Sequence, residues 1–342
     1  MTIALDATYS LGKNLSGVGV YSREMLFGLA TAHPQEKFRF CYRPHRFLKS
    51  FNDKLPRNAS RRLLRGAPSA DIFHALNQRV DAKARRTVST FHDLFVMTGD
   101  YSSPAFRARF TAQARDAAER SDLIIAVSNF TASQIKQLLK VEPSRIRVVH
   151  HGARAVYRAV TAGSAHGPGT QNLVLSVGAI QRRKNIARLV KAFELLPDNW
   201  RLALAGAPNG FGAAEELVAV EESQARPRID VLGYVSSAQL DALYRRASIF
   251  AFPSLDEGFG MPILEAMAHG IPVMTSICSA MPEVAGDAAL LVDPLNIGDA
   301  LLSLATNEPL RENLIRRGLE RIKQFTWNST VEKTWSVYDE LK

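Results

Sequence analysis

The sequence has few cysteines and no long uncharged stretch. Cys41 and Cys278 are the two cysteines among 342 residues, and neither has a His or Cys at metal-ligand spacing. This argues against a disulfide framework and a zinc site, so we expect buried thiols. No run reaches the roughly 18 apolar residues that span a bilayer, and the first residues lack the pattern of a signal peptide. We therefore expect a cytoplasmic protein.

Two series of short apolar runs alternate with helical patterns. The first series is TIALDAT, KFRFCY, DIFHAL, TVSTFHDL, LIIAVS and IRVVHHG, and the second is NLVLSVGAI, RLALAGA, RIDVLGYV, IFAFPS and IPVMTS. Strands that alternate with helices pair in parallel, so the fold class is α/β, with two Rossmann-like doubly wound domains facing a shared cleft. We predict an N-terminal domain at 1–155, a linker at 156–170, a C-terminal domain at 171–325 and a final helix at 326–342.

Positive charge is concentrated in the first half. Residues 1–155 hold 25 Lys and Arg against 12 Asp and Glu, whereas residues 156–342 hold 18 against 21. Residues 36–65 alone contain ten basic and two acidic residues. Apolar residues are interleaved with them, namely Phe38, Phe40, Phe47, Leu48 and Phe51. The segment suits an anionic membrane surface, a diphosphate-linked acceptor or nucleic acid, and a solvated basic face is the simpler alternative.

The stretch DEGFGMPILEAMAHG joins a predicted strand to a predicted helix. Gly258 and Gly260 would let the backbone approach a ligand, and Pro262 fits the first helical turn, whose NH groups can face an anion. Glu257 and Glu265 are eight positions apart, so both carboxylates can bracket one ligand and accept hydrogen bonds from sugar or ribose hydroxyls. A cap residue followed by an unrelated helix glutamate is the structural alternative.

A basic turn follows a second predicted strand in SVGAIQRRKNIARLV. Gly178 ends the strand, Arg182, Arg183 and Lys184 follow, and we expect a helix capped near Asn185. Adjacent cations at a strand end suit a diphosphate, because they stabilise charge on a departing nucleotide. An exposed basic turn without function is the alternative.

The first domain offers weaker signals. Gly17 and Gly19 in SGVGVYSRE lie between a strand and a helix, where a tight turn would equally require them. His92 and Asp93 follow the strand TVSTF, and a single histidine in such a place is more often structural.

The segment PSLDEGFGMPILEAMAHGIPV closely resembles the Glu-x7-Glu signature of the retaining glycosyltransferases of family 4, which have the GT-B fold. The resemblance implies a nucleotide-sugar donor bound by the second domain. Glu257 would bind the sugar hydroxyls, Glu265 the ribose hydroxyls, and the NH groups of Gly258, Phe259 and Gly260 would lie near the sugar and diphosphate. It also implies that the final helix returns to the first domain.

The same resemblance gives roles to the other motifs. Arg183 and Lys184, after Gly178, match the cations that the family uses for the diphosphate. The loop of Gly17 and Gly19 would face the diphosphate and acceptor. The pair His92 and Asp93 would face the donor.

Three positions depart from the family pattern. Arg182 is an additional charge without a family role, and His151 stands where the family more often has Asn. The segment SICSA replaces common glycines, so no donor contact is assigned to Cys278 or Ser279.

Together these features predict a metal-independent, retaining hexosyltransferase that needs no cofactor beyond its nucleotide-sugar co-substrate. No Asp-x-Asp motif lies at a predicted strand end, so Arg183, Lys184 and the helix at Met261 would offset the diphosphate charge. The RKN and FHDL segments resemble bacterial mannosyltransferases of polysaccharide assembly. GDP-mannose is therefore the favoured donor and UDP-glucose the alternative.

The expected acceptor is a glycan or a polyprenyl-diphosphate-linked chain. Residues 36–65 would attach the protein peripherally to the inner face of the membrane. Two other classes stay open: a GT-B sugar-nucleotide epimerase and a nucleic-acid-binding protein. The acidic balance of the second half argues against the latter, so we expect no nucleic acid.

Overall fold

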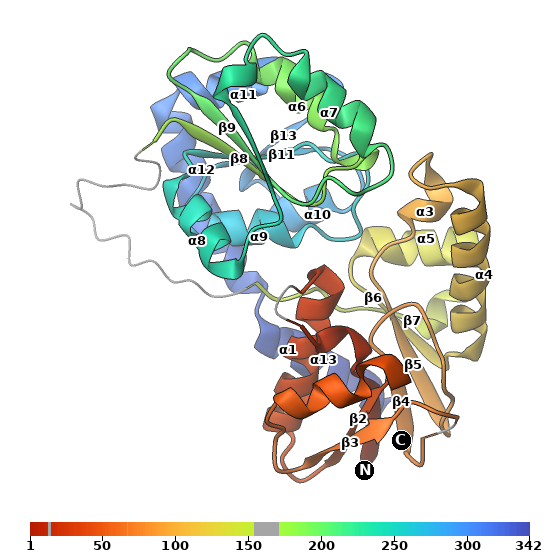
Figure 1. Cartoon of the computed structure of the whole chain (residues 1–342). Helices are drawn as coiled ribbons and strands as arrows, with labels where there is room; N and C mark the ends of the chain where they lie inside the picture. Colours follow the sequence, from red (N-terminus) through yellow and green to blue (C-terminus); the bar gives the residue numbers. More distant parts are fainter. Residues whose placement is uncertain (13–14, 67, 154–170) are drawn as a thin grey trace. The chain divides into compact units, whose positions relative to one another are not determined.

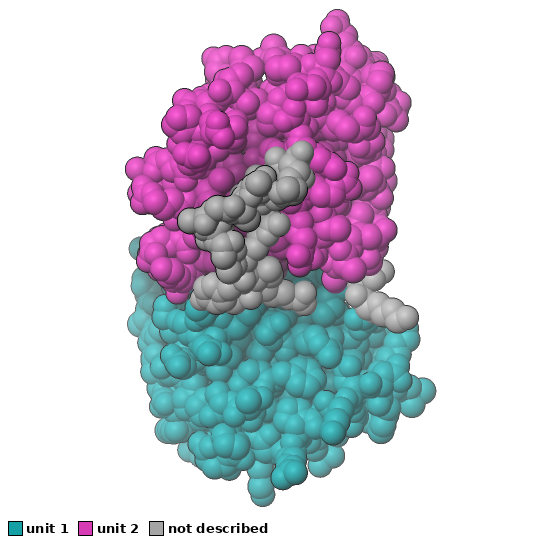
Figure 2. Space-filling view, turned by 90° about the vertical axis from the view of Figure 1, so that its left-hand side faces the viewer, with its two compact units in different colours: residues 1–98, 104–152, 325–342 teal, residues 99–103, 153–324 magenta. Residues whose placement is uncertain are grey.

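The computed structural model describes residues 1–12, 15–66, 68–153 and 171–342. The chain forms two compact units, coloured separately in Figure 2. Unit 1 comprises Met1–Thr98, Pro104–Gly152 and Phe325–Lys342, and unit 2 comprises Gly99–Ser103 and Ala153–Gln324. The predicted linker at 156–170 lies outside the described residues.

Unit 1 contains a seven-stranded parallel sheet (Figure 1) in the order β3-β2-β1-β4-β5-β6-β7. Its strands are β1 Thr2–Asp6, β2 Lys37–Tyr42, β3 Ala59–Leu63, β4 Ile72–Ala75, β5 Arg86–Phe91, β6 Leu123–Ala126 and β7 Ile146–Val148. The strand order reverses between β1 and β4, which pair directly. This doubly wound order agrees with the predicted fold class.

Helices cover both faces of this sheet. They are α1 Gly17–Ala32, α2 Pro44–Phe47, α3 Phe95–Thr98, α4 Pro104–Arg120, α5 Asn129–Leu139 and α13 Trp327–Asp339. One core layer joins α1 and α13 to side chains such as Ile3 and Phe40, and the other joins α4 and α5 to side chains such as Ala4 and Phe91. Alternate residues of a strand point to opposite faces, so β1 contributes to both layers.

The prediction of an aromatic and basic surface over residues 36–65 is wrong for two of its residues. Phe38 and Phe40 belong to β2 and are fully buried in the core layer under α1. Their period-2 spacing places both on the inner face of the sheet. Leu48 and Phe51, by contrast, lie in the short helical turn Leu48–Asn52 and are 81% and 61% exposed.

The C-terminal helix α13 is part of unit 1. It packs against α1, where a Cβ atom on Gly28 would lie only 2.6 Å from Val331. The imidazole of His33 stacks on the indole of Trp335, with ring centroids 3.5 Å apart. The Tyr338 hydroxyl lies 2.6 Å from His74 Nδ1 in the sheet. The last helix is therefore integrated into the core of unit 1.

Unit 2 contains a six-stranded parallel sheet in the order β10-β9-β8-β11-β12-β13. Its strands are β8 Leu173–Val177, β9 Arg201–Ala205, β10 Ile229–Gly233, β11 Ile249–Phe252, β12 Val273–Ser276 and β13 Ala289–Val292. Its helices are α6 Ile186–Phe193, α7 Ala213–Glu221, α8 Ser237–Arg246, α9 Met261–Ala268, α10 Met281–Ala285, α11 Gly298–Thr306 and α12 Glu308–Arg321. Among the described helices, none combines the length and apolarity that a bilayer span requires.

Candidate functional site

The two charged motifs of unit 2 follow neighbouring strands. The strand order reverses between β8 and β11, which pair directly. Ligands of open parallel sheets bind at the carboxyl ends of the strands at such a reversal. The RRK turn, residues Arg182–Lys184, follows β8, and the loop that carries Glu257 follows β11. The topology thus brings both motifs to one edge of the sheet.

Arg183, Lys184 and Glu257 form one cluster at this edge. The Glu257 Oε1 atom lies 2.6 Å from Arg183 Nη1 and 2.5 Å from Lys184 Nζ. All three side chains are largely buried, with 10–12% of their surface exposed. One carboxylate oxygen therefore joins two cations in a region with little water, where electrostatic interactions are strong.

The cluster keeps Glu257 ionised. Burial raises the pKa of the Glu257 carboxyl, but Arg183 and Lys184 outweigh that effect and lower the pKa to about 2. At neutral pH the three side chains carry two positive charges and one negative charge. The cluster is therefore a net cationic site at the end of two parallel strands.

Lys184 and Arg183 are each positioned by their surroundings. Gly178 has a φ of +137°, and a Cβ atom there would lie 3.0 Å from Lys184 Cε. The Lys184 ammonium also lies 4.5 Å from the centre of the Phe252 ring. Arg183 Nη1 donates to the Asp256 carbonyl at 2.9 Å. Gly178 is thus needed both for its backbone conformation and for the space that Lys184 occupies.

Asn185 locks the basic turn to neighbouring loops. It has a left-handed backbone, with φ 60° and ψ 38°, and makes no side-chain cap. Its Nδ2 atom donates to the carbonyls of Pro253 at 3.2 Å and Pro294 at 2.8 Å. The prediction of a helix that begins near Asn185 is confirmed, because Asn185 is the N-cap residue of α6. Its side chain, however, makes no capping hydrogen bond, and its amide connects the loops after β8, β11 and β13.

The loop before α9 contains one glycine with a left-handed backbone. Gly260 has a φ of +107°, and Pro262 lies in the first turn of α9. The Glu257 NH donates to Ser279 Oγ at 3.0 Å. Ser279 itself has a φ of 50°, which explains why glycine would suit this position. Sequence reasoning assigned no role to Ser279, and the structure shows that it supports the Glu257 backbone.

Glu265 makes a different contact from Glu257. Its Oε2 atom accepts a hydrogen bond of 3.0 Å from the Tyr244 hydroxyl of α8. Tyr244 is buried, and its ring stacks on His269 with centroids 4.9 Å apart. No motif predicted this pairing, because Tyr244 lies on a helix without a recognised motif. Tyr244 thus positions the Glu265 carboxylate.

Arg182 serves a contact within unit 2. Its guanidinium lies 2.5 Å from Asp100 Oδ2 and 3.7 Å from Glu215 Oε1, and it stacks over Phe211. The unassigned charge of the RRK turn is thus neutralised by two carboxylates.

The glycines of the first motif lie at the start of α1 in unit 1. Gly17 is the first helical residue, and the Ser16 side chain caps the helix by accepting from the Gly19 NH at 3.3 Å. A Cβ atom on Gly19 would lie 2.9 Å from the Tyr9 carbonyl oxygen. Gly19 therefore has a packing role, and ligand contacts of this loop stay a prediction.

His92 lies at the end of β5 with its ring in the core of unit 1. Its Nε2 donates to the Leu76 carbonyl at 2.9 Å, so Nδ1 is the acceptor and faces His151 Nε2 at 3.4 Å. Burial lowers the pKa of His92 to about 4, so the ring is neutral at pH 7. Tyr21 of α1 packs against both imidazoles. Asp93 follows, half-buried, and a donor role for either residue stays a prediction.

A charged cluster that sequence reasoning missed lies at the carboxyl ends of β1 and β2. The fully buried Asp6 lies 3.3 Å from Arg43 Nη2, and Arg43 Nε lies 2.6 Å from Asp81 Oδ2. The Arg43 guanidinium also stacks over the ring of the exposed Tyr9. Nothing in the local sequence connects these residues, because they follow three different strands.

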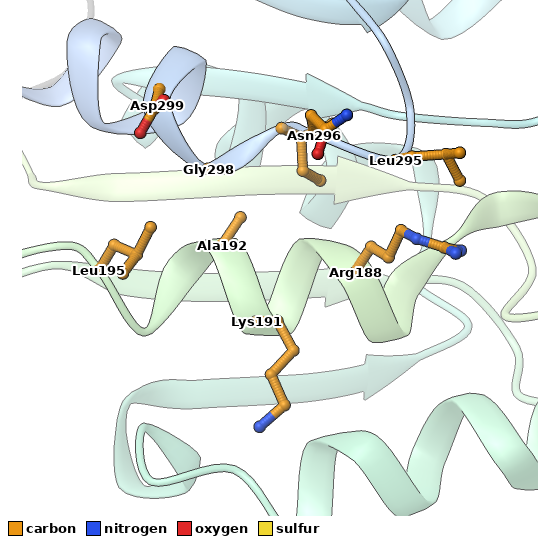
Figure 3. Close-up of a pocket in the computed structure, with 9 residues that line it drawn as sticks. Arg188, Lys191, Ala192, Leu195, Leu295, Asn296, Gly298 and Asp299 are labelled. Atoms are coloured by element: carbon orange, nitrogen blue, oxygen red, sulfur yellow. The ribbon is translucent and has the colours of Figure 1, made fainter.

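Two further features concern ligands. Among the described residues, no three His, Cys, Asp or Glu side chains are grouped as a metal ion would require. A cavity of about 330 Å³ in unit 2 lies between α6 and residues 295–299 (Figure 3), and no predicted site residue lines it.

A cationic cluster at the strand reversal of one Rossmann-like unit, together with a second such unit, defines the architecture of a GT-B glycosyltransferase. Two family descriptions match the chain: "Glycosyltransferase Family 4" over residues 17–155 and "Glycosyl transferases group 1" over residues 164–321. The chain belongs to the glycosyltransferase family that these two descriptions cover, as the sequence resemblance predicted.

Known proteins support the assignment over the whole chain. The O-antigen chain mannosyltransferase B of Escherichia coli is 29% identical, covering 97% of this chain and 98% of its own. A D-inositol 3-phosphate glycosyltransferase of Nocardioides is 30% identical over 78% of this chain and 67% of its own. The solved structure of sucrose-phosphate synthase from Thermosynechococcus elongatus has a TM-score of 0.76 at 20% identity, covering 100% of this chain and 99% of its own. The fold is thus GT-B, and the chain is a transferase.

Proposed function

We propose that the protein is a retaining mannosyltransferase that uses GDP-mannose and needs no metal ion. The observation that carries the proposal is the cluster of Arg183, Lys184 and Glu257 at the reversal of the unit 2 sheet. Its net positive charge suits the diphosphate of a nucleotide sugar. Mannose as the transferred sugar is supported by the O-antigen mannosyltransferase that resembles the whole chain.

In the proposed reaction, the acceptor hydroxyl attacks the anomeric carbon on the face from which the nucleotide leaves. The bond between that carbon and the diphosphate oxygen breaks, and the hydroxyl proton passes to the departing phosphate. Arg183 and Lys184 stabilise the charge that develops on the leaving diphosphate. Glu257 holds the two cations in place and accepts hydrogen bonds from the donor sugar, while Glu265 accepts from the ribose.

The proposal assigns donor contacts and acceptor contacts to different residues. In unit 2, the NH groups of Gly258, Phe259 and Gly260 approach the donor next to the start of α9. In unit 1, the surface of Tyr9, Arg43 and Asp81 is proposed to bind the glycan acceptor. An exposed aromatic ring beside a carboxylate offers a sugar both a stacking face and a hydrogen-bond acceptor.

The decisive experiment measures turnover of GDP-mannose, UDP-glucose and ADP-glucose with a polyprenyl-diphosphate-linked glycan. GDP-mannose is expected to react fastest, with equal rates in EDTA and in magnesium, and NMR of the product should show the donor's anomeric configuration. Preference for UDP-glucose would refute GDP-mannose as the donor, and loss of activity in EDTA would refute metal independence. A product with inverted anomeric configuration would refute the retaining mechanism. Donor incubated alone should give no epimer.

We also propose that residues 36–65 attach the protein to an anionic membrane surface. The exposed Leu48 and Phe51 can insert among headgroups, and Arg46, Lys49 and Lys54 lie near them in the sequence. Sedimentation with phosphatidylglycerol vesicles tests this. The double variant Leu48→Ser/Phe51→Ser should lose binding, whereas Leu195→Ser/Leu295→Ser, which changes exposed leucines of unit 2, should retain it. Equal binding by both variants would refute the proposal.

A further inference from the structure

Unit 1 also contains a group of positively charged side chains, apart from the cationic cluster of unit 2. These side chains surround a cavity that the proposed reaction does not use. The cavity has a volume of about 230 Å³ and lies along the ends of β2 and β3. It is lined by Arg39, Cys41, Arg62, Leu63, Leu64, Arg65, Gly66, Pro68 and Ser69. Three arginines and no acidic residue are among the lining residues.

Strand alternation explains why Arg39 and Arg62 share one face. Arg39 and Cys41 are two residues apart on β2, so they lie on the same face of the sheet. Cys41 is the register partner of Arg62 on β3, and a diagonal neighbour such as Arg39 lies roughly 7 Å away. Phe38 and Phe40, which alternate with them in sequence, face the opposite core layer. The sheet itself therefore brings Arg39 and Arg62 together, and Arg65 follows two residues after the end of β3.

The positive charges of Arg39 and Arg62 both act on the buried thiol of Cys41. Burial raises the pKa of Cys41 to about 12, and the nearby Arg39 and Arg62 charges oppose this rise. The Cys41 and Leu64 side chains at the cavity belong to the core layer that α4 and α5 cover farther along the sheet. The cavity thus has an apolar floor and a guanidinium rim.

The guanidinium groups have no carboxylate partner. Across residues 1–12, 15–66, 68–153 and 171–342, neither Arg39, Arg62 nor Arg65 forms a salt bridge, and Arg62 donates only to the Arg61 carbonyl. Arg61, on the other face of β3, is used structurally and donates to the carbonyl of Ser50 at 3.0 Å. Like charges gathered without a counter-ion repel one another, and a bound anion would relieve that repulsion.

We propose that this cavity is a binding site for a phosphate or diphosphate group, separate from the nucleotide-sugar site of unit 2. Guanidinium groups bind phosphate oxygens through paired hydrogen bonds, and the Ser69 hydroxyl adds a further donor. At about 30 Å³ per water molecule, the cavity holds about eight waters, which is room for a diphosphate. The group is carried by an anionic lipid or is free in solution.

Arginine footprinting with phenylglyoxal and mass spectrometry tests the site in the intact chain. Inorganic pyrophosphate at ten times its Kd should slow modification of Arg62 and Arg65 about tenfold by mass action. Arg85, which is exposed and lies outside both the cavity and residues 36–65, is the internal control and should react at an unchanged rate. Vesicles that contain phosphatidic acid, compared with vesicles that contain phosphatidylserine, form the second arm.

Each outcome decides a point. Protection of Arg62 and Arg65 by pyrophosphate alone supports a free phosphate compound, and protection by phosphatidic acid vesicles supports a lipid phosphomonoester. Equal protection of Arg85, or no protection in either arm, overturns the proposal. By calorimetry, Arg62→Gln/Arg65→Gln should weaken pyrophosphate binding at this site about tenfold, whereas Lys83→Gln/Arg85→Gln, with the same charge loss, should not. Glycosyl transfer is not measured, so failure here leaves the proposed function untouched.

Discussion

Replacing Glu257 with glutamine removes the negative charge that joins Arg183 and Lys184. The two cations would then repel each other in a region where each is only 10–11% exposed. The pKa of Glu257 falls from 4.5 to about 2, and each pKa unit corresponds to about 1.4 kcal/mol. We therefore expect Glu257→Gln to lower the free energy of unfolding of unit 2 by about 3 kcal/mol at pH 7.

The assay is urea denaturation followed by tryptophan fluorescence. Trp200 is buried in unit 2, whereas Trp327 and Trp335 lie in unit 1, so a Trp327→Phe/Trp335→Phe background reports on unit 2 alone. Because the folded-state pKa is lowered, the contribution of Glu257 is complete above pH 4.5 and is lost as the pH falls toward 2. The difference between the variants should therefore narrow below pH 4.

The control variant is Glu221→Gln, which removes the partner of Arg226 on the surface. That carboxylate lies 2.9 Å from the guanidinium but is 62% exposed, so a loss of less than about 1 kcal/mol is expected. GDP should also stabilise Glu257→Gln more than the wild type, because its diphosphate replaces the missing charge. A Glu257→Gln protein as stable as the wild type at pH 7 would refute the electrostatic account of the cluster.

Three further predictions follow from individual contacts. Gly178→Ala should reduce kcat about tenfold by displacing Lys184, whereas Gly233→Ala, where an added Cβ meets nothing within 4 Å, should not, and equal kcat values would contradict this reasoning. Tyr244→Phe should weaken nucleotide binding about fivefold in calorimetry, since Glu265 loses one hydrogen bond, and an unchanged Kd would exclude a positioning role for Tyr244. Burial lowers the pKa of His74 to about 3 and that of His92 to about 4, so the stability of unit 1 should be complete above pH 6.5 and fall by about 2 kcal/mol for each at pH 5. Denaturation midpoints of unit 1 that do not change between pH 7.5 and 5 would contradict the buried, neutral histidines.

The fold could be predicted from the sequence because each strand and each loop motif is formed by residues that are close together in the chain. Glycines, a proline and charges at the ends of apolar runs indicated where ligands approach the second sheet, and Arg183, Lys184 and Glu257 do meet there. The alternation of apolar and basic residues in KFRFCY also indicated a strand with one buried face. The hypothesis of an aromatic and basic surface over residues 36–65 did not take this into account. Phe38 and Phe40 are inside and Arg39 is on the other face, as strand periodicity requires.

The remaining contacts could not be predicted because they join residues from different elements. Tyr244 reaches Glu265 from another helix, and Ser279 reaches the Glu257 backbone from the loop after β12. Asn185 looked like a helix cap because caps are often Asn, but its amide serves two prolyl carbonyls instead. Such partners become known only when the strand order is known.

The charge of the unit 2 cluster also has a consequence for turnover. Glu257 Oε1 is paired with one guanidinium nitrogen of Arg183 and with the Lys184 ammonium, the two cations that we propose for the diphosphate. In the proposed site, a bound nucleotide would share the cations with this carboxylate, which would weaken binding of donor and product alike. Since release of the nucleoside diphosphate can limit turnover, a built-in anion that competes for the same cations favours release. Glu257 would thus lower the affinity for GDP and raise the rate of its release. Glu257→Gln should therefore bind GDP more tightly and turn over more slowly.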